Sequence, residues 1–80
     1  MMVEVKLPQL SMGVVDCQVS RWLATVGDRV EQGQLLIEID TDKTVTEIEA
    51  PEAGVLVEIR HPAGVVVGVG ETLGVIDTAA

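Results

Sequence analysis

The sequence has almost no aromatic residues: Phe and Tyr are absent, and Trp22 is the single one. A folded interior must therefore be filled by Val, Leu and Ile, and the β-branched members of this group favour strands over helices. We predict an all-β fold, with Trp22 packing at the edge of the core. A chain of 80 residues holds one domain and buries only about 60% of its unfolded surface. We therefore predict a single domain over residues 1–80.

Basic residues are scarce as well. Five Lys and Arg stand against thirteen Asp and Glu, which gives a formal net charge of −8. Nucleic acids and anionic membranes both reward clustered positive charge, so we exclude them as partners and expect a basic protein surface instead. No apolar run approaches the roughly 18 residues of a membrane span, and residues 1–4 lack the features of a secretory signal. The expected location is the cytoplasm, or the mitochondrial matrix if the source is eukaryotic.

Cysteine and histidine occur once each, as Cys17 and His61. A lone cysteine forms no internal disulfide, and we predict that Cys17 is a small core residue. A lone histidine without a second His or Cys does not complete a metal site, so we predict no metal and an exposed turn position for His61.

Known catalytic patterns are missing too. Ser11 and Ser20 lack the surroundings of a nucleophile elbow, and no phosphate-binding Gly-rich loop is present. A calcium loop starting at Asp40 would need Gly and Glu where Val45 and Pro51 stand. We therefore predict no catalytic residue and expect the chain to act as a carrier or a binding module.

What the sequence does contain is a pattern of strands. Residues 3–7 alternate between apolar and polar and stop at Pro8, which cannot donate to a ladder, so a first strand is expected to end there. Residues 16–23 alternate again, which predicts a strand with Cys17, Val19 and Leu23 on one face and Trp22 on the other or at its end. The segment between them is predicted to be a surface loop.

The most informative stretch is residues 37–49, I-E-I-D-T-D-K-T-V-T-E-I-E. Apolar residues alternate before and, more loosely, after a polar tip, which is typical of two half-buried strands joined by a tight turn. Asp side chains can bond their own backbone two residues on, so Asp40 and Asp42 are expected to form the turn. Lys43, one of only two lysines in the chain, would project from its tip.

The chain also repeats itself. When residues 27–40 are displaced by 37 positions onto residues 64–77, six of the fourteen positions are identical, where about one is expected by chance. Upstream of residue 27 the two copies share only the alternation of apolar residues, at a displacement of 40 positions. The identical pairs are Gly27 and Gly64, Val30 and Val67, Gly33 and Gly70, Leu36 and Leu73, Ile39 and Ile76, and Asp40 and Asp77.

Two such copies, residues 1–40 and 41–80, bury their apolar faces if they oppose each other around a pseudo-two-fold axis. The predicted architecture is a flattened β-barrel or sandwich of two four-stranded halves. Equivalent ends of the two copies then place the Lys43 turn at one end and the chain termini at the other. The repeated glycines are expected at tight corners with positive φ, which only Gly adopts without cost.

The segment Asp40-Thr41-Asp42-Lys43-Thr44 resembles the modification site of the lipoyl domains of 2-oxo acid dehydrogenase acyltransferases. The order and spacing of several further motifs extend the resemblance over nearly the whole chain. These are Leu7-Pro8, Trp22-Leu23, residues 26–30, Gly33, Ala50-Pro51 and Gly54.

The resemblance implies a barrel-sandwich fold and lipoic acid bound to Lys43 as an amide, with Asp42 and Thr44 presenting the turn. It implies a swinging-arm carrier rather than an enzyme. The partners it implies are a lipoate ligase or lipoyl transferase, a thiamine-diphosphate-dependent 2-oxo acid decarboxylase, an acyltransferase core and a dihydrolipoamide dehydrogenase.

Two alternatives stay open on the sequence alone. Biotinyl domains share the architecture, but their lysine usually stands between methionines, whereas Asp42 and Thr44 flank Lys43. The second alternative is an unmodified barrel-sandwich module that makes protein contacts.

Overall fold

The computed structural model describes residues 1–9, 16–41 and 44–79 and contains no helix among them. The described residues accordingly include no helix that could cross a membrane. Eight strands make up the fold: β1 (Met2–Lys6), β2 (Asp16–Trp22), β3 (Arg29–Val30), β4 (Leu35–Asp40), β5 (Val45–Glu49), β6 (Gly54–Ile59), β7 (Val66–Gly68) and β8 (Thr72–Asp77).

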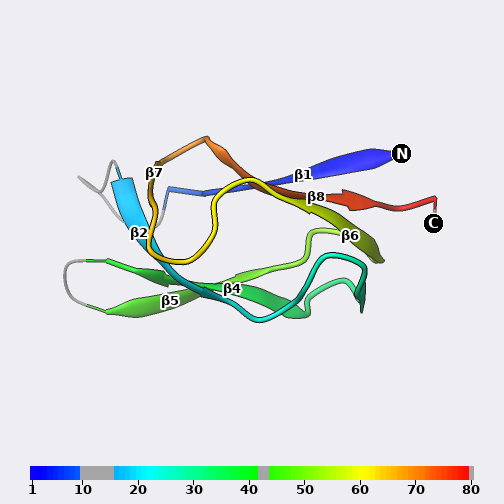
Figure 1. The fold of residues 1–80 in the computed structure, drawn as a ribbon, viewed down its shortest axis with the longest axis horizontal. Helices are drawn as coiled ribbons and strands as arrows, with labels where there is room; N and C mark the ends of the chain where they lie inside the picture. Colours follow the sequence, from blue (N-terminus) through cyan, green and yellow to red (C-terminus); the bar gives the residue numbers. More distant parts are fainter. Residues whose placement is uncertain (10–15, 42–43, 80) are drawn as a thin grey trace.

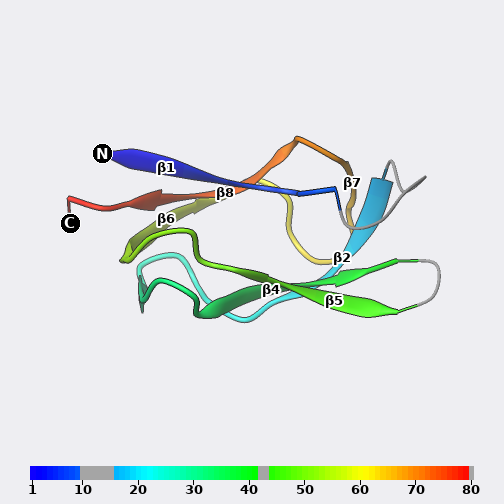
Figure 2. The same cartoon turned by 180° about the vertical axis from the view of Figure 1, so that it is seen from behind.

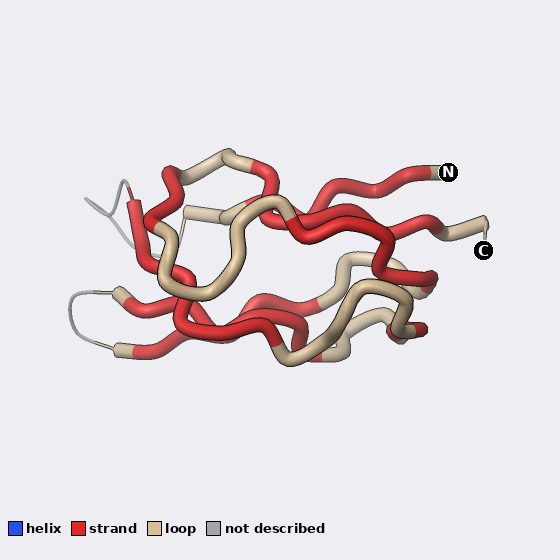
Figure 3. Tube along the Cα trace, in the orientation of Figure 1, coloured by secondary structure: helices blue, strands red, loops and turns tan. Residues whose placement is uncertain are grey.

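The strands form two antiparallel sheets with four strands each (Figure 1). One sheet has the order β1-β8-β6-β3 and the other the order β5-β4-β2-β7. They lie on each other as two layers of a flattened sandwich, 36 × 19 × 18 Å in extent, and do not close into a barrel (Figure 3). The predicted all-β fold of two four-stranded layers is confirmed.

The core between the sheets is aliphatic, as the lack of aromatic residues requires. No polar or charged residue is buried in the described part of the chain. Cys17 is 4% exposed, which confirms its predicted place in the core. The largest fully buried side chains are Leu7, Val19, Val30, Leu36, Ile37, Ile39, Leu56, Val67, Leu73 and Ile76.

The internal repeat is present in the three-dimensional structure. The equivalent strands of the two sheets are β1 and β5, β8 and β4, β6 and β2, and β3 and β7. They follow one another in the same order in both sheets. Backbone hydrogen bonds repeat with the same displacement: Leu23 N donates to Leu36 O, and Arg60 N donates to Leu73 O. Each sheet takes strands from both sequence halves, because β1 and β3 pair with strands from the second half. The division into one domain with halves 1–40 and 41–80 stays a prediction.

The displacement of 40 expected for the upstream part of the repeat is wrong. Gln18 lies opposite Asp40 and Val55 lies opposite Asp77, so the displacement is 37 here as well. Both ladders shift register at the same place, at Ser20 in β2 and at the equivalent residue 57 in β6. A β-bulge places one extra residue against the partner strand and breaks the period of two on which sequence patterns depend.

The same bulge changes which side chains of β2 face the core. Cys17 and Val19 point inward before it, but Trp22 packs against the core after it and Leu23 is 40% exposed. The predicted inward face of Leu23 is therefore wrong. The ladder between β4 and β5 is also irregular between Leu35 and Ile37, so that Leu36 is buried and Leu35 is exposed.

Trp22 joins the two repeats at their edge. Its indole Nε1 donates to the carbonyl of His61 at 2.8 Å, and its ring lies so close to Gly74 that an added Cβ there would be 2.7 Å away. His61 is half-buried rather than exposed as predicted, since its Nδ1 lies 2.9 Å from the carbonyl oxygen of Thr72. The predicted edge position of Trp22 is confirmed.

The two ends of the sandwich hold different parts of the chain. Both termini lie at one end of the long axis, and the ends of β4 and β5 that flank residues 42 and 43 lie at the other (Figures 1 and 2). The strand ends thus follow the predicted separation, whereas Lys43 and Ala80 lie outside the described residues.

The turn glycines have the predicted positive φ: Gly33 has φ 85° and Gly70 has φ 92°. A Cβ added at either position would meet nothing within 4 Å, so only the backbone conformation opposes a side chain there. We expect Gly33→Val or Gly70→Val to lower the free energy of unfolding by about 1–3 kcal/mol, measured by chemical denaturation. Gly33→Asn is the matched control and should lose less, because Asn tolerates this region. A loss below about 0.5 kcal/mol for the Val variants would contradict the assignment.

Candidate functional site

The hairpin β4–β5 is held to the sandwich by its inward-facing side. Ile37 pairs with Ile48 across the ladder and Ile39 pairs with Thr46, and both isoleucines of β4 are fully buried. Asp40 and Val45 form the last pair before the turn. Because this inner side is packed into the core, the ends of β4 and β5 at Asp40 and Val45 are held in place.

Hydrogen bonds between Thr41 and Thr44 close the hairpin beyond the last strand pair. Thr41 N donates to Thr44 O at 2.9 Å, and Thr41 Oγ1 donates to the same oxygen at 2.9 Å. Thr44 N lies 3.2 Å from Thr41 Oγ1. The structure therefore brings together the two threonines on either side of Asp42 and Lys43 in the sequence.

Of the residues predicted for this site, Asp42 and Lys43 lie outside the described residues. Thr44 is exposed and takes part in the closure through its backbone. The side chain that makes the turn hydrogen bonds is Thr41, whereas no hydrogen bond of the Asp40 carboxylate with another described residue is present. Sequence reasoning missed Thr41, although the internal repeat contains a signal for it: extending the match by one position pairs Thr41 with Thr78.

The chain termini form an open copy of the same closure. Thr78 N donates to Met1 O at 2.9 Å and Thr78 Oγ1 donates to Met1 O at 3.0 Å, as Thr41 does to Thr44. Asp77 lies beside the terminal amine of Met1, with the nitrogen 3.7 Å from its Oδ1. The copies differ in the two residues after the threonine, which are Asp42-Lys43 in one and Ala79-Ala80 in the other. The closure by a threonine is therefore common to both ends of the sandwich and does not by itself distinguish the predicted site.

The outer side of the hairpin is acidic. Glu38 and Glu47 lie directly opposite each other on β4 and β5, a pairing of like charges that costs stability unless a cation compensates it. Arg21 on β2 supplies the cation, with its Nε 2.9 Å and its Nη2 3.2 Å from the two carboxylate oxygens of Glu38. The hydrogen bond and charge of Glu38 raise the pKa of the Arg21 guanidinium. No described cation forms an ion pair with Glu47, so negative charge remains beside the turn.

Comparisons with known proteins match this fold and this turn to one family. The family described as "Biotin-requiring enzyme", the biotin/lipoyl domain, matches residues 3–76. The lipoyl domain of the 2-oxoglutarate dehydrogenase complex from Azotobacter vinelandii superposes with a TM-score of 0.77 at 33% identity, over 94% of this chain and 95% of that one. The chain belongs to the biotin/lipoyl domain family. Within it, the chain is a lipoyl domain.

Sequence relatives agree. A dihydrolipoyllysine-residue succinyltransferase component of the 2-oxoglutarate dehydrogenase complex from Bacillus subtilis is 42% identical over 99% of this chain. A dihydrolipoyllysine-residue acetyltransferase component of the pyruvate dehydrogenase complex from Corynebacterium glutamicum is 40% identical over 94%. The lipoyl domain spans only 19% and 11% of the length of these two relatives.

A structure of a carboxylase also matches. Urea carboxylase from Kluyveromyces lactis superposes with a TM-score of 0.82 at 26% identity, over 96% of this chain and 6% of that one. The sandwich fold is thus present in that protein as well. The lipoyl assignment rests on the higher identity and the nearly complete mutual coverage with the Azotobacter vinelandii lipoyl domain.

The residues of the hairpin fit a covalently attached lipoyl group. Such a group needs a lysine amine on a rigid support, with no enclosing cavity. Ile37 and Ile39 anchor the support in the core, and Thr41 and Thr44 fix the strand ends on either side of the lysine.

We expect Thr41→Val to loosen the hairpin end, because it removes the hydroxyl that bonds Thr44 and keeps nearly the same shape. Loss of one such hydrogen bond corresponds to about 0.5–1.5 kcal/mol, or roughly 2- to 12-fold faster solvent exchange of the Thr44 amide. Solvent-exchange NMR measures it. Thr41→Ser should restore the wild-type rate, and Thr78→Val is the matched control that removes the equivalent hydroxyl at the other end. Unchanged exchange in Thr41→Val would show that the backbone alone closes the turn.

Proposed function

We propose that this lipoyl domain is a swinging-arm carrier whose lipoyl group is attached to Lys43. The observation that supports the proposal is the closure of the hairpin β4–β5: Thr41 and Thr44, which flank Asp42 and Lys43 in the sequence, are hydrogen-bonded at the end of the sandwich opposite the chain termini. Amide formation removes the lysine charge and changes the formal net charge from −8 to −9.

The domain's own contribution is presentation. A rigid hairpin limits the positions that the attachment point of the lipoyl arm can take. Tethering raises the local concentration of the arm at each partner active site. When bound, the lipoyl group supplies reversible dithiol chemistry and accepts acyl groups. The termini at the far end allow attachment to other segments without blocking the turn (Figure 2). We assign no catalytic step to this domain's own residues.

The partners we propose follow from the relatives and from charge. The relatives are acyltransferase components of 2-oxo acid dehydrogenase complexes. We propose that a thiamine-diphosphate-dependent 2-oxo acid decarboxylase loads the arm, that an acyltransferase core unloads it and that a dihydrolipoamide dehydrogenase reoxidises it. A lipoate ligase or lipoyl transferase would modify Lys43. Since Glu38 and Glu47 lie on the outer side of the hairpin, each partner should present basic residues to it.

Two other functions are the alternatives. A biotinyl carrier is compatible with the urea carboxylase likeness, but Asp42 and Thr44 flank the lysine in place of the methionines usual in biotinyl domains. An unmodified module for protein contacts would leave Lys43 as an ordinary turn lysine. Both alternatives predict a different mass for the protein from its native host.

Intact-mass measurement and peptide mapping test the attachment site. In protein made with lipoate and a ligase, we expect a single lipoyl group on Lys43 and none on Lys6, because Lys6 lies on β1 rather than on a turn. Lys43→Arg should abolish the modification and leave the fold unchanged. Lipoylation of Lys6, biotin on Lys43 or no modification in the native host would each contradict the proposal.

A shifted lysine tests whether the ligase reads position. Asp42→Lys combined with Lys43→Gln keeps one lysine in the turn but redirects its side chain, so we expect lipoylation to be about 100-fold slower. The open copy at the termini provides a second comparison: in a Lys43→Gln background, Ala79→Asp with Ala80→Lys recreates the sequence Asp-Thr-Asp-Lys without chain closure. We expect no lipoylation there. Rates near the wild type in either variant would show that the local sequence suffices, and circular dichroism controls for folding.

A further inference from the structure

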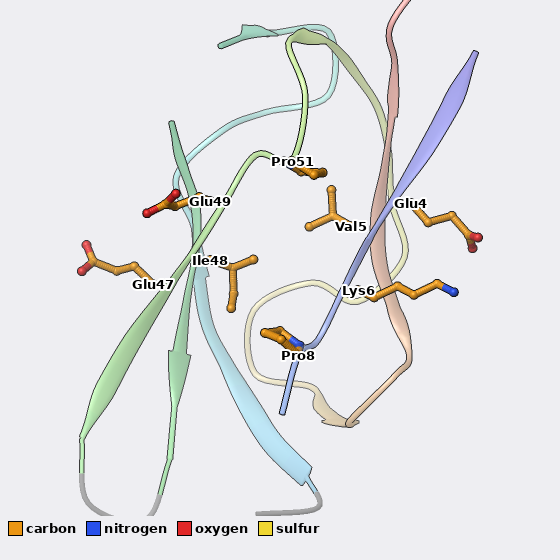
Figure 4. Close-up of a pocket in the computed structure, with 8 residues that line it drawn as sticks. All are labelled: Glu4, Val5, Lys6, Pro8, Glu47, Ile48, Glu49 and Pro51. Carbon is orange, nitrogen blue, oxygen red and sulfur yellow. The ribbon is translucent and has the colours of Figure 1, made fainter. Parts of the chain in front are cut away.

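A groove of about 350 Å³ lies between the two sheets where β1 and β5 face each other (Figure 4). Both are edge strands: among the described strands, β1 pairs only with β8 and β5 pairs only with β4. Edge strands present backbone N–H and C=O groups that can accept an additional strand. The groove is therefore bordered on both sides by backbone able to bind an extended segment.

The groove is lined by equivalent residues of the two repeats. The two members of each pair are 43 positions apart in the sequence. This is the displacement that relates β1 to β5: Lys6 lies opposite Thr72 and Glu49 opposite Leu35, which are themselves 37 positions apart. The four pairs are Glu4 and Glu47, Val5 and Ile48, Lys6 and Glu49, and Pro8 and Pro51.

The groove is apolar inside and charged at its borders. Val5, Ile48, Pro8 and Pro51 lie between the two strands, while the charged side chains point away from them on either side (Figure 4). Val5 and Ile48 form its floor at 3% and 8% exposure. An extended segment that bound here would place every second side chain over this apolar interior.

The two borders differ in charge although they are equivalent in shape. On the β1 side, Glu4 accepts a hydrogen bond from Thr72 Oγ1 at 2.7 Å and lies 3.6 Å from Arg60, and Lys6 stands beside it. These contacts, the hydrogen bond first, lower the pKa of the Glu4 carboxyl. Lysine at an edge is a common protection against strand addition. The negative charge of Glu4 on the β1 border is thus compensated, and Lys6 opposes the addition of a strand there.

On the β5 side, Glu47 and Glu49 have no ion pair with any other residue that the structure describes. They are two positions apart on one strand, so their side chains share one face at a spacing of about 6.6–6.8 Å. Side chains at alternate positions of an added strand have the same spacing, and opposite charges directly across a ladder stabilise the pairing. The β5 border therefore complements two basic side chains separated by one residue.

We propose that the free edge of β5 is a docking site for an extended segment of a partner protein with the pattern basic–apolar–basic. Its two Lys or Arg side chains pair with Glu47 and Glu49, and the residue between them covers Ile48 and enters the groove. Its backbone extends the sheet β5-β4-β2-β7 by one strand. Pro51 limits the pairing to a segment about as long as β5. This inference goes beyond the carrier function and does not rest on modification of Lys43.

NMR titration of the isotope-labelled 80-residue chain with acetyl-Thr-Lys-Val-Arg-Thr-amide tests the proposal. We expect saturable shifts confined to residues 45–49 and to the groove residues of β1. A peptide of the same composition with adjacent basic residues, and a backbone N-methylated peptide, should bind much more weakly. Equal binding of the rearranged peptide, shifts spread over the acidic surface, or no saturable binding at about 1 mM peptide would overturn the proposal.

Variants of the chain test whether peptide affinity depends on the charges of Glu47 and Glu49. Each carboxylate should contribute about 1.5- to 5-fold in affinity, so Glu47→Gln with Glu49→Gln should weaken binding by about 2- to 25-fold. The matched control, Asp16→Asn with Glu31→Gln, removes the same charge from exposed positions outside the groove and should change affinity less than about 2-fold. An equal loss in both double variants would indicate general electrostatic attraction and overturn the proposal. Self-association through the same edge, detected by sedimentation, would assign it to a second copy and also overturn it.

Discussion

Face-to-face packing of two small sheets over an aliphatic core is the constraint on which the rest of the structure depends. With no Phe or Tyr and one Trp, no single layer buries enough apolar surface, and the core is completed only when Leu36 and Ile39 of one sheet meet Leu73 and Ile76 of the other. Two similar sheets meeting in this way give the molecule an approximate two-fold symmetry. The positions of the turns, the edges and the termini result from that symmetry.

The symmetry also explains how a rigid hairpin is obtained in so small a domain. The inner sides of β4 and β8 are fully packed, while their ends extend beyond the core. At one end the chain continues through Asp42 and Lys43; at the other it is open, and Thr78 bonds Met1 instead. One set of strands therefore supports the closed end of the hairpin β4–β5 and the two chain termini, with the length of the sandwich between them.

Much of the fold was predictable from the sequence, and the errors in strand register have one physical cause. Alternation predicted the strands, the repeated glycines predicted the corners, and the displacement of 37 predicted the equivalence of the sheets. The register within strands was not predictable where a bulge intervenes: at Ser20 the period of two is interrupted, so Trp22 turns inward where Leu23 was expected. The irregularity between Leu35 and Ile37 likewise leaves Leu36 buried next to Ile37. At the site, the neighbours of Lys43 in the sequence predicted its role, which stays a prediction. The role of Thr41 was not predicted, because it depends on the distance between Thr41 and Thr44 that the strands impose.

Internal symmetry makes the positions that depart from it informative. Where both copies serve only the core, their residues are similar: Val19 and Leu56 are fully buried, and Val5 and Ile48 are equivalent apolar floor residues. Equivalent positions with different chemistry are not explained by packing, since the backbone and burial are the same in both copies. Glu49 against Lys6 is one such departure, because both side chains are exposed at equivalent places. This difference distinguishes the two edges of the groove. In the sequence alone, Lys43 against Ala80 is another departure. In a domain built by repetition, comparing its own halves separates residues that hold the fold from residues retained for a partner.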